Sequence, residues 1–128
     1  MNCYLRQMFI NIQNGYLSRC NFILQPRQAN CELILKILWK EGFILGYQIS
    51  YKNKKKIKIF LKYKNNNSVL KKLKILSKSS CKIFYSSTEV LKINSNKLFV
   101  IFFTKYGVKT IDFCRKYQIG GEPIVCFI

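Results

Sequence analysis

The chain has 128 residues, 49% of them hydrophobic, which is enough for one compact domain or for two small lobes that share a core. Its 23 lysines and arginines stand against 5 acidic residues and no histidine, giving a formal net charge of +18. Such an imbalance opposes folding by self-repulsion and favours a polyanionic partner, with nucleic acid the leading candidate. The missing histidines and the scattered carboxylates make an enzyme a poor candidate and exclude the usual Cys/His zinc patterns.

Two helices are predicted near the N-terminus. Apolar residues recur at helical spacing over Leu5–Asn14, and Gly15 follows where a helix would end. An irregular piece ends at Pro26. The next segment, NCELILKILWKEG, predicts a helix with Asn30 as its N-cap and Gly42 after its end. Its apolar face is expected to comprise Leu33, Ile34, Ile37 and Leu38.

The hydrophobic period then changes to that of strands. The segments FILGYQISY and KKIKIFLKY predict a hairpin, and in the second segment lysines alternate with apolar residues. One face of this strand is therefore expected to be apolar and the other, with Lys56, Lys58 and Lys62, cationic. The tip between the strands, KNKKK, fits a solvated loop and direct phosphate contact equally well.

Asn65–Asn67 is the clearest linker, so we predict an N-terminal lobe of residues 1–64 and a C-terminal lobe of residues 65–128. Beyond the linker, VLKKLKILS and CKIFYS are predicted as short basic strands, LFVIFFT as a buried strand and IVCFI as a final strand. Thr110 is expected to cap a short helix that Gly120 and Gly121 close. No internal repeat is present.

The most site-like segment follows the LFVIFF run. Thr104, Lys105, Tyr106 and Gly107 predict a turn that presents a hydroxyl, an ammonium group, an aromatic ring and a freely approached backbone. RNA recognition uses such groups on phosphates, 2′-hydroxyls and unstacked bases. The competing interpretation is a plain β-to-α turn with a half-buried Tyr106.

The sequence shows no sign of a membrane-spanning or targeting segment, and its cysteines suggest no metal site within the chain. No run reaches the ~18 apolar residues of a membrane span. The start, MNCYLRQMFI, resembles neither a secretory signal nor a transit peptide, so we expect synthesis in the compartment where the protein works. The six cysteines are interpreted as small buried or half-buried hydrophobes, the alternative being a metal bridged to another chain.

A family resemblance joins these pieces. The segments WKEGFILGY, LKY, LSKSSCKIF, TKYGVKT and GGEPIVCFI occur in the order found in the eighth protein of the bacterial-type small ribosomal subunit, over nearly the whole chain. The resemblance implies an α/β (α+β) protein of two small lobes, the N-terminal one with two helices and a small sheet. The C-terminal lobe is then mainly antiparallel strands with one short helix. It further implies a structural protein with no cofactor, no metal and no small-molecule substrate.

The resemblance also implies a partner, the central domain of the small-subunit ribosomal RNA, with neighbouring small-subunit proteins beside it. The family's Ser-Thr-Ser-x-Gly loop falls on Phe103–Gly107, where only Thr104 and Gly107 are retained, while its Gly-Gly-Glu is intact as residues 120–122. Together with nearby basic and polar positions, the predicted RNA-binding residues are Asn11, Asn14, Arg27, Gln28, Lys58, Ser77, Lys78, Lys82, Thr104, Lys105, Tyr106, Gly107, Lys109 and Glu122.

The excess of Lys, Asn, Ile, Phe and Tyr suggests A+T-rich codons, from which we expect an organelle-encoded protein of the mitochondrial ribosome, with a plastid as the alternative. A different function also fits the charge, namely a basic module outside the ribosome that binds a membrane or an acidic protein.

Overall fold

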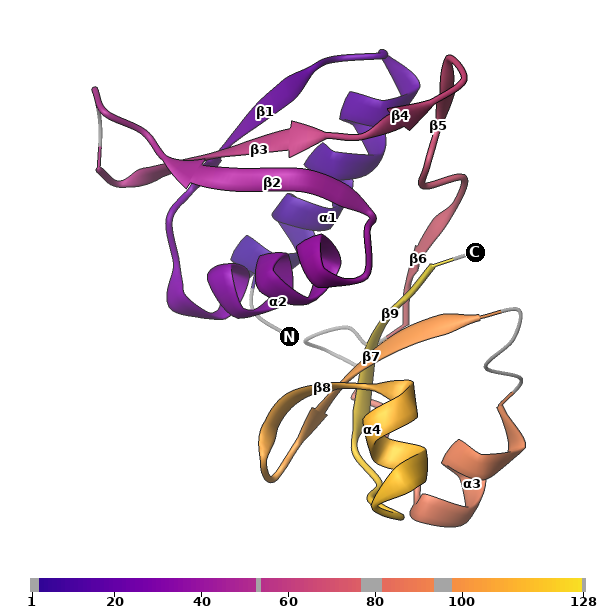
Figure 1. Ribbon diagram of the computed structural model, residues 1–128. Coiled ribbons are helices and arrows are strands. Elements are labelled where there is room, and N and C mark those ends of the chain that lie inside the picture. The colour runs from indigo at the N-terminus through magenta and orange to yellow at the C-terminus, as the bar shows by residue number, and fades with distance from the viewer. Residues whose placement is uncertain (1–2, 53, 77–81, 94–97, 128) are drawn as a thin grey trace. The chain divides into compact units, whose positions relative to one another are not determined.

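A computed structural model describes residues 3–52, 54–76, 82–93 and 98–127. The chain divides into two compact units, Asn2–Lys71 and Lys72–Ile128. Each unit combines helices with antiparallel strands (Figure 1), and the helices of the second unit are the shorter, as expected for the α+β class.

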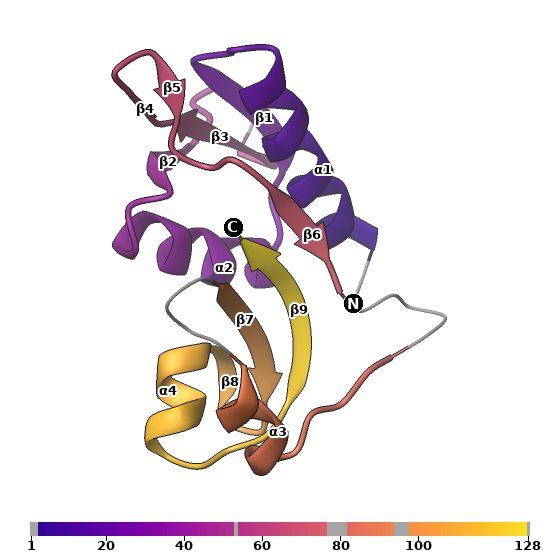
Figure 2. The same cartoon turned by 90° about the vertical axis from the view of Figure 1, so that its right-hand side faces the viewer.

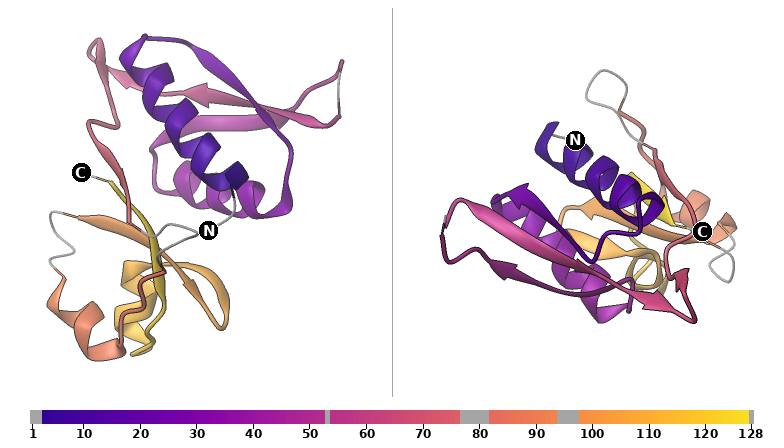
Figure 3. Two further views of the ribbon diagram at one scale, coloured as in Figure 1. Left: turned by 180° about the vertical axis from the view of Figure 1, so that it is seen from behind. Right: turned by 90° about the horizontal axis from the view of Figure 1, so that it is seen from above.

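The N-terminal unit is a three-stranded sheet with two helices on one face. Helix α1 (Cys3–Leu17) precedes strand β1 (Phe22–Pro26), and helix α2 (Ala29–Lys40) precedes strands β2 (Ile44–Ile49) and β3 (Lys56–Leu61). The strand order is β1-β3-β2, with both pairings antiparallel. Both helices lie on the same side of this sheet, as the views from behind and from above show (Figure 3).

The predicted β2–β3 hairpin is confirmed, and the alternation along β3 explains its burial. Ile57, Ile59 and Leu61 are almost fully buried, whereas the residues that alternate with them, Lys56, Lys58 and Phe60, are not. Because successive side chains of a strand point to opposite faces, these three residues meet the helices. The core that they complete also contains, from the helices, Leu5, Met8, Phe9, Ile12, Cys31, Ile34, Leu35 and Leu38.

Two local expectations for the first helix and strand were wrong. Helix α1 continues through Gly15 to Leu17, because Gly15 is a close-packing site: a Cβ there would lie 2.8 Å from Ile23 Cγ2 and 2.9 Å from Leu61 Cδ1. The helix ends at Leu17, and Arg19, two residues beyond it, adopts a positive φ in the turn that follows. The piece ending at Pro26 is not irregular but is strand β1, which is paired along its length with β3.

The second helix also differs in detail from its prediction. Helix α2 begins at Ala29 with Gln28 in the N-cap position, so Asn30 lies inside the first turn. Leu33, expected on the apolar face, is 45% exposed, and Cys31 and Leu35 are buried instead. The predicted stop is confirmed, since Gly42 has φ +83° and its N–H donates to the carbonyl of Trp39.

The asparagine segment forms a tight turn. Asn65 and Asn66 have φ values of 53° and 62° between the two-residue strands β4 (Tyr63–Lys64) and β5 (Asn67–Ser68). Asparagine tolerates this left-handed conformation better than most residues, which fits the turn chemistry expected of it. These residues lie within the N-terminal unit.

The C-terminal unit is a four-stranded antiparallel sheet of order β6-β9-β7-β8 (Figure 2). Its strands are β6 (Leu73–Ile75), β7 (Phe99–Thr104), β8 (Gly107–Thr110) and β9 (Glu122–Phe127). Two short helices, α3 (Ser87–Lys92) and α4 (Ile111–Lys116), complete it. The core on the helix side contains Val90, Val100, Phe102, Ile111, Cys114 and Cys126.

The predicted strands at LFVIFFT and IVCFI are confirmed, as is the cap of α4. The Thr110 hydroxyl accepts from the Phe113 N–H, with Asp112 in the first turn and two basic residues in the last. Gly120 and Gly121 do not close this helix. Gln118 does so with φ 53°, and the N–H of the next residue, Ile119, donates to the Cys114 carbonyl.

Three elements near these strands were predicted wrongly. The described part of CKIFYS, residues 82–86, is no strand and pairs only through a bridge from Tyr85 to Gly121, because the chain turns there into α3. Helix α3 was not expected, although Ser86 caps it through the Glu89 N–H. Strand β8 was also missed, since GVKT is too short for a clear period and is defined by its pairing with β7.

The cysteines only partly follow their interpretation as buried hydrophobes. Within the described ranges, Cys31, Cys114 and Cys126 are buried, whereas Cys3 and Cys20 are exposed; Cys81 lies outside these ranges. Burial raises the pKa of all three buried thiols, and for Cys31, with a smaller contribution from the Glu32 carboxylate, to about 11. These three thiols therefore stay neutral and behave as apolar side chains.

Candidate nucleic-acid interface

The turn after β7 is the loop of a β-hairpin. Thr104 pairs with Gly107 across β7 and β8, which leaves Lys105 and Tyr106 as a two-residue loop. Gly107 has φ +103°, a conformation that L side chains rarely adopt. The predicted turn is therefore a β-to-β hairpin rather than a β-to-α connection, and it projects two consecutive side chains from the end of the sheet.

Hydrogen bonds of Thr104 hold this loop in shape. Its Oγ1 donates to the Gly107 carbonyl oxygen at 2.9 Å and accepts from the Tyr106 N–H at 3.2 Å. The hydroxyl proton is thus used within the turn, and an acceptor lone pair is left for other contacts. Thr104 consequently fixes the positions of its neighbours, besides any direct contact that it makes.

Three lysine–aromatic pairs occur in the loop, between β8 and α4, and at the end of α4. Lys105 Nζ lies 5.0 Å from the ring centroid of Tyr106, Lys109 Nζ lies 4.7 Å from Phe113, and Lys116 Nζ lies 5.4 Å from Tyr117. The ring centroids of Phe113, on α4, and Tyr117, its C-cap residue, are 4.6 Å apart. We call these six residues the hairpin–α4 surface.

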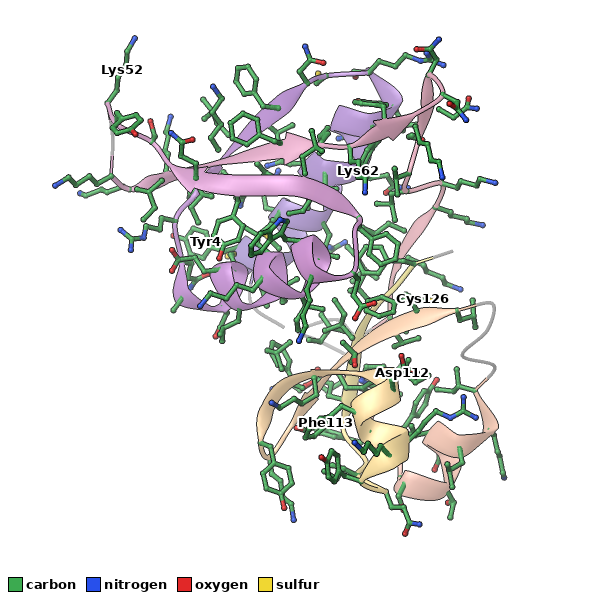
Figure 4. The ribbon with its side chains drawn as sticks, viewed as in Figure 1. Tyr4, Lys52, Lys62, Asp112, Phe113 and Cys126 are labelled. Carbon is green, nitrogen blue, oxygen red and sulfur yellow. The ribbon has the colours of Figure 1, made fainter. Side chains whose placement is uncertain are left out.

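The hairpin–α4 surface contains a pocket of about 430 Å³. It is lined by Lys105 and Tyr106 from the loop, by Phe113 from α4, and by Tyr117, Gln118 and Ile119 after that helix. Phe113 is labelled in Figure 4, where it lies on the side of α4 next to β8. Flat rings beside ammonium groups suit a base with its phosphates, because rings stack on bases and ammonium groups attract phosphate.

Phe113, Lys116 and Tyr117 were not among the RNA-binding residues predicted from the sequence. A signal was present, since Phe113 and Tyr117 are four residues apart and so share one face of a helix. What could not be read was that this face lies beside the hairpin, because β8 and the tertiary packing of α4 bring the two together.

The Gly-Gly-Glu segment supports the base of the hairpin. A Cβ on Gly121 would lie 2.5 Å from the Phe103 carbonyl oxygen, and one on Gly120 would lie 2.4 Å from that of Tyr85. Glu122 pairs with Phe103 in the sheet and is 8% exposed. Both glycines are therefore required for close backbone packing, and little of the Glu122 side chain is accessible to RNA.

The residues of the N-terminal unit that were predicted to bind RNA differ in exposure and in hydrogen-bond partners. Asn11 Nδ2 donates to the buried Gln25 Oε1 at 2.6 Å, so its amide satisfies an interior group. Arg27 Nε lies 3.3 Å from Glu32 Oε1, while Asn14 is exposed on α1. Gln28 is the half-buried residue before α2.

Among the lysines, Lys58 lies on the open face of the sheet, with its Nζ 4.0 Å from the Phe22 ring centroid. Lys82 is exposed, and Lys109 belongs to the hairpin–α4 surface. Ser77 and Lys78, also predicted to bind RNA, lie outside the described residues. The structure thus brings together five predicted residues on one hairpin, namely Thr104, Lys105, Tyr106, Gly107 and Lys109.

The described residues hold no sign of a metal site or of a membrane-spanning helix. Within the described ranges, no three His, Cys, Asp or Glu side chains gather as metal ligands would. The helices described are also too short or too polar to cross a membrane.

Comparison with known proteins identifies the family. The family model described as "Ribosomal protein S8" matches residues 4–128. The chain belongs to the ribosomal protein S8 family. It is 34% identical over 124 residues to the small ribosomal subunit protein uS8 of Buchnera aphidicola subsp. Cinara cedri, covering 97% of this chain and 95% of that protein.

Further relatives carry the same name. The small ribosomal subunit protein uS8 of Wigglesworthia glossinidia brevipalpis is 31% identical over the same coverage, and that of Blochmanniella pennsylvanica is 30% identical over 125 residues. As a member of the S8 family, the chain is a structural protein of the small ribosomal subunit and not an enzyme. A basic module outside the ribosome is not supported.

Proposed function

We propose that the hairpin–α4 surface is where this S8-family protein grips small-subunit ribosomal RNA. The observation that carries the proposal is the set of three lysine–aromatic pairs on this surface. Tyr106 is 58% exposed at the tip of a rigid hairpin, so an unstacked base can lie against its ring without moving the fold.

The lysines, the aromatic rings and the turn backbone make different contributions to RNA binding. Lysines neutralise phosphates without regard to sequence and supply much of the affinity. Tyr106 and the Phe113–Tyr117 ring pair supply stacking, and the backbone of the Thr104–Gly107 turn supplies shape. A cationic, aromatic contact in this way replaces the two serines that the family resemblance leads one to expect at positions 103 and 105.

We further propose the central domain of the small-subunit RNA as the target. Binding there would support subunit assembly and hence translation. Asn14, Arg27, Gln28, Lys58, Ser77, Lys78 and Lys82 are proposed as further contacts with RNA, and other small-subunit proteins as neighbours. Exposed Asn14 and Lys82 have open side chains for such contacts.

We propose the mitochondrial ribosome as the location, with a plastid ribosome as the alternative. The support is the excess of amino acids that A+T-rich codons encode. The relatives described above are bacterial, so a bacterial ribosome is the competing location. Sequencing the DNA molecule that carries the gene separates them: an organellar genome supports the proposal, and a bacterial chromosome overturns it.

Binding to three partners tests the function directly. The full chain is titrated with a fragment of the small-subunit RNA central domain, with a scrambled RNA of equal length and with anionic phospholipid vesicles, all at one salt concentration. We expect the central-domain fragment to bind at least tenfold more tightly than either control. Equal affinity for all three would show only non-specific attraction of a basic protein and would overturn the proposal.

A further inference from the structure

A second aromatic and cationic pocket lies in the N-terminal unit. It measures about 530 Å³ and is lined by Lys36, Trp39 and Lys40 of α2 and by Tyr47 of β2. Trp39 is 58% exposed, although it is among the most apolar and costly side chains to leave in water. None of these four residues belongs to the RNA contacts proposed above.

The pocket is built by the turn between α2 and β2. Gly42 reverses the chain after α2, and the Phe43 N–H donates to the Leu38 carbonyl at 2.9 Å. Strand β2 then returns beside α2. Tyr47 pairs with Ile59, whose side chain is buried under the helices, so Tyr47 is on the sheet face that carries α2. Trp39 and Tyr47, the two ends of the segment WKEGFILGY, thereby line one pocket.

Packing does not explain this arrangement. The residues with which α2 contacts the core are Cys31, Ile34, Leu35 and Leu38, and Trp39 is outside that set. Lys36 and Lys40 are one turn apart, an i, i+4 pair of like charges that slightly destabilises a helix. An anionic ligand between them would reverse that cost.

We infer that this pocket holds one unstacked nucleotide of single-stranded RNA, with its base on the Trp39 ring and its phosphates beside Lys36 and Lys40. A nucleotide combines a flat aromatic group with negative charge, and the pocket combines rings with two ammonium groups. An acidic peptide matches the charge but leaves the exposed ring unmatched. The inference rests on the proposed RNA-binding function and adds a contact on the other unit.

The chain offers a direct probe, because Trp39 is its single tryptophan. The full chain is titrated with a labelled oligoadenylate of about eight nucleotides, a length within the usual site size of single-strand binders. Fluorescence anisotropy of the label reports binding, and Trp39 emission reports occupancy of the pocket. We expect saturable quenching of Trp39 with the same midpoint as the anisotropy.

Two sets of variants measure separately what the Trp39 ring and the two lysines contribute to oligoadenylate affinity. Trp39→Leu and the double variant Lys36→Gln/Lys40→Gln are each expected to weaken oligoadenylate binding about tenfold. The matched control Lys71→Gln/Lys72→Gln removes the same charge at two exposed positions outside the pocket and is expected to change affinity less than threefold. Equal losses in the two double variants would overturn the inference.

Two further outcomes decide between partners. Binding of oligoadenylate with unchanged Trp39 emission would overturn this inference and leave the proposed function standing, whereas no RNA binding by any measure would overturn both. A response of Trp39 to an oligoglutamate peptide, without a response to oligoadenylate, would identify the pocket as a protein contact and likewise overturn the inference.

Discussion

The Thr104 hydroxyl donates to the carbonyl oxygen of Gly107 at 2.9 Å, across the first pair of the β7–β8 hairpin. This bond, with that from the Tyr106 N–H, fixes a loop that has only two residues. The loop carries Lys105 and Tyr106, so the proposed contact with RNA would depend on a side chain that faces the turn.

Replacing Thr104 by Val keeps the β-branched shape and removes both hydrogen bonds. We expect the free energy of unfolding to fall by about 1 kcal/mol and RNA affinity to fall with it, since the loop is no longer held. Chemical denaturation and RNA titration measure the two effects, and Thr104→Ser, which retains the hydroxyl, is the matched control. Wild-type affinity in Thr104→Val would show that the turn needs no such bond.

Replacing Tyr106 by Ala tests stacking at the tip. We expect a loss of about 1–3 kcal/mol in binding to the central-domain fragment, because a base would lose its aromatic support. Tyr106→Phe, which keeps the ring, should bind nearly as well as the wild type. Tyr51→Ala removes an even more exposed tyrosine from the other unit and serves as control. Full affinity in a folded Tyr106→Ala protein would mean that no base stacks there.

Replacing Lys105 by Ala tests phosphate contact. We expect the slope of log affinity against log salt concentration to become shallower by about one counterion, because one ammonium group no longer neutralises a phosphate. Lys105→Arg should keep the wild-type slope. The measurement is a salt series of RNA binding, and an unchanged slope in Lys105→Ala would remove this lysine from the phosphate contacts.

Replacing Gly121 by Ala tests the close packing beneath the hairpin. The added Cβ would lie 2.5 Å from the Phe103 carbonyl oxygen and 3.1 Å from Thr104 Cγ2, so backbone has to move. We expect the free energy of unfolding to fall by about 1–3 kcal/mol. Gly46→Ala is the control, since no atom lies within 4 Å of its Cβ, and its effect should stay within about 0.5 kcal/mol. Equal stability of the two variants would contradict the packing seen at Gly121.

The buried thiol of Cys31 predicts a loss of stability at high pH. Its pKa is raised by burial, and further by Glu32, to about 11, against about 8.5 for an unfolded chain. The unfolded chain therefore releases this proton first, and the stabilising contribution is complete below about pH 8.5 and disappears as pH rises towards 11. The full effect is of order 3 kcal/mol.

Urea denaturation between pH 8 and pH 10.5 measures this effect against a Cys31→Ala variant. The variant should be less stable at pH 8, because it leaves a small cavity in the core, but its stability should decline less steeply with pH. Parallel curves for the two proteins would show that Cys31 does not contribute to the pH dependence.

Helices and strands with a clear hydrophobic period could be predicted from the sequence. Strands that depend on hydrogen bonds to a neighbouring strand could not. The alternation of Lys and Ile in β3 and the apolar face of α1 were sufficient to identify both. Strand β1 has no such alternation, and strand β8 has only four residues. Both exist because a neighbouring strand supplies hydrogen bonds to their backbones, which no local pattern records.

Glycines show the same contrast. Gly42 and Gly107 adopt a positive φ, which their place after a helix or in a turn predicted. Gly15 and Gly121 are glycines because another part of the chain approaches them closely, from Leu61 in the first case and from Phe103 in the second. A conformational requirement is local and can be read from neighbours in the chain, whereas a close approach depends on the fold.

The sequence by itself determined the net charge, the class of partner, the main helices and strands, and the position of the exposed turn at Lys105 and Tyr106, because charge and hydrophobic period are properties of neighbouring residues. Only the tertiary structure decided that Lys109 lies over Phe113 and that Trp39 and Tyr47 line one pocket. Those approaches arise from hairpin register and helix packing, which set the distances between residues that the chain itself keeps apart.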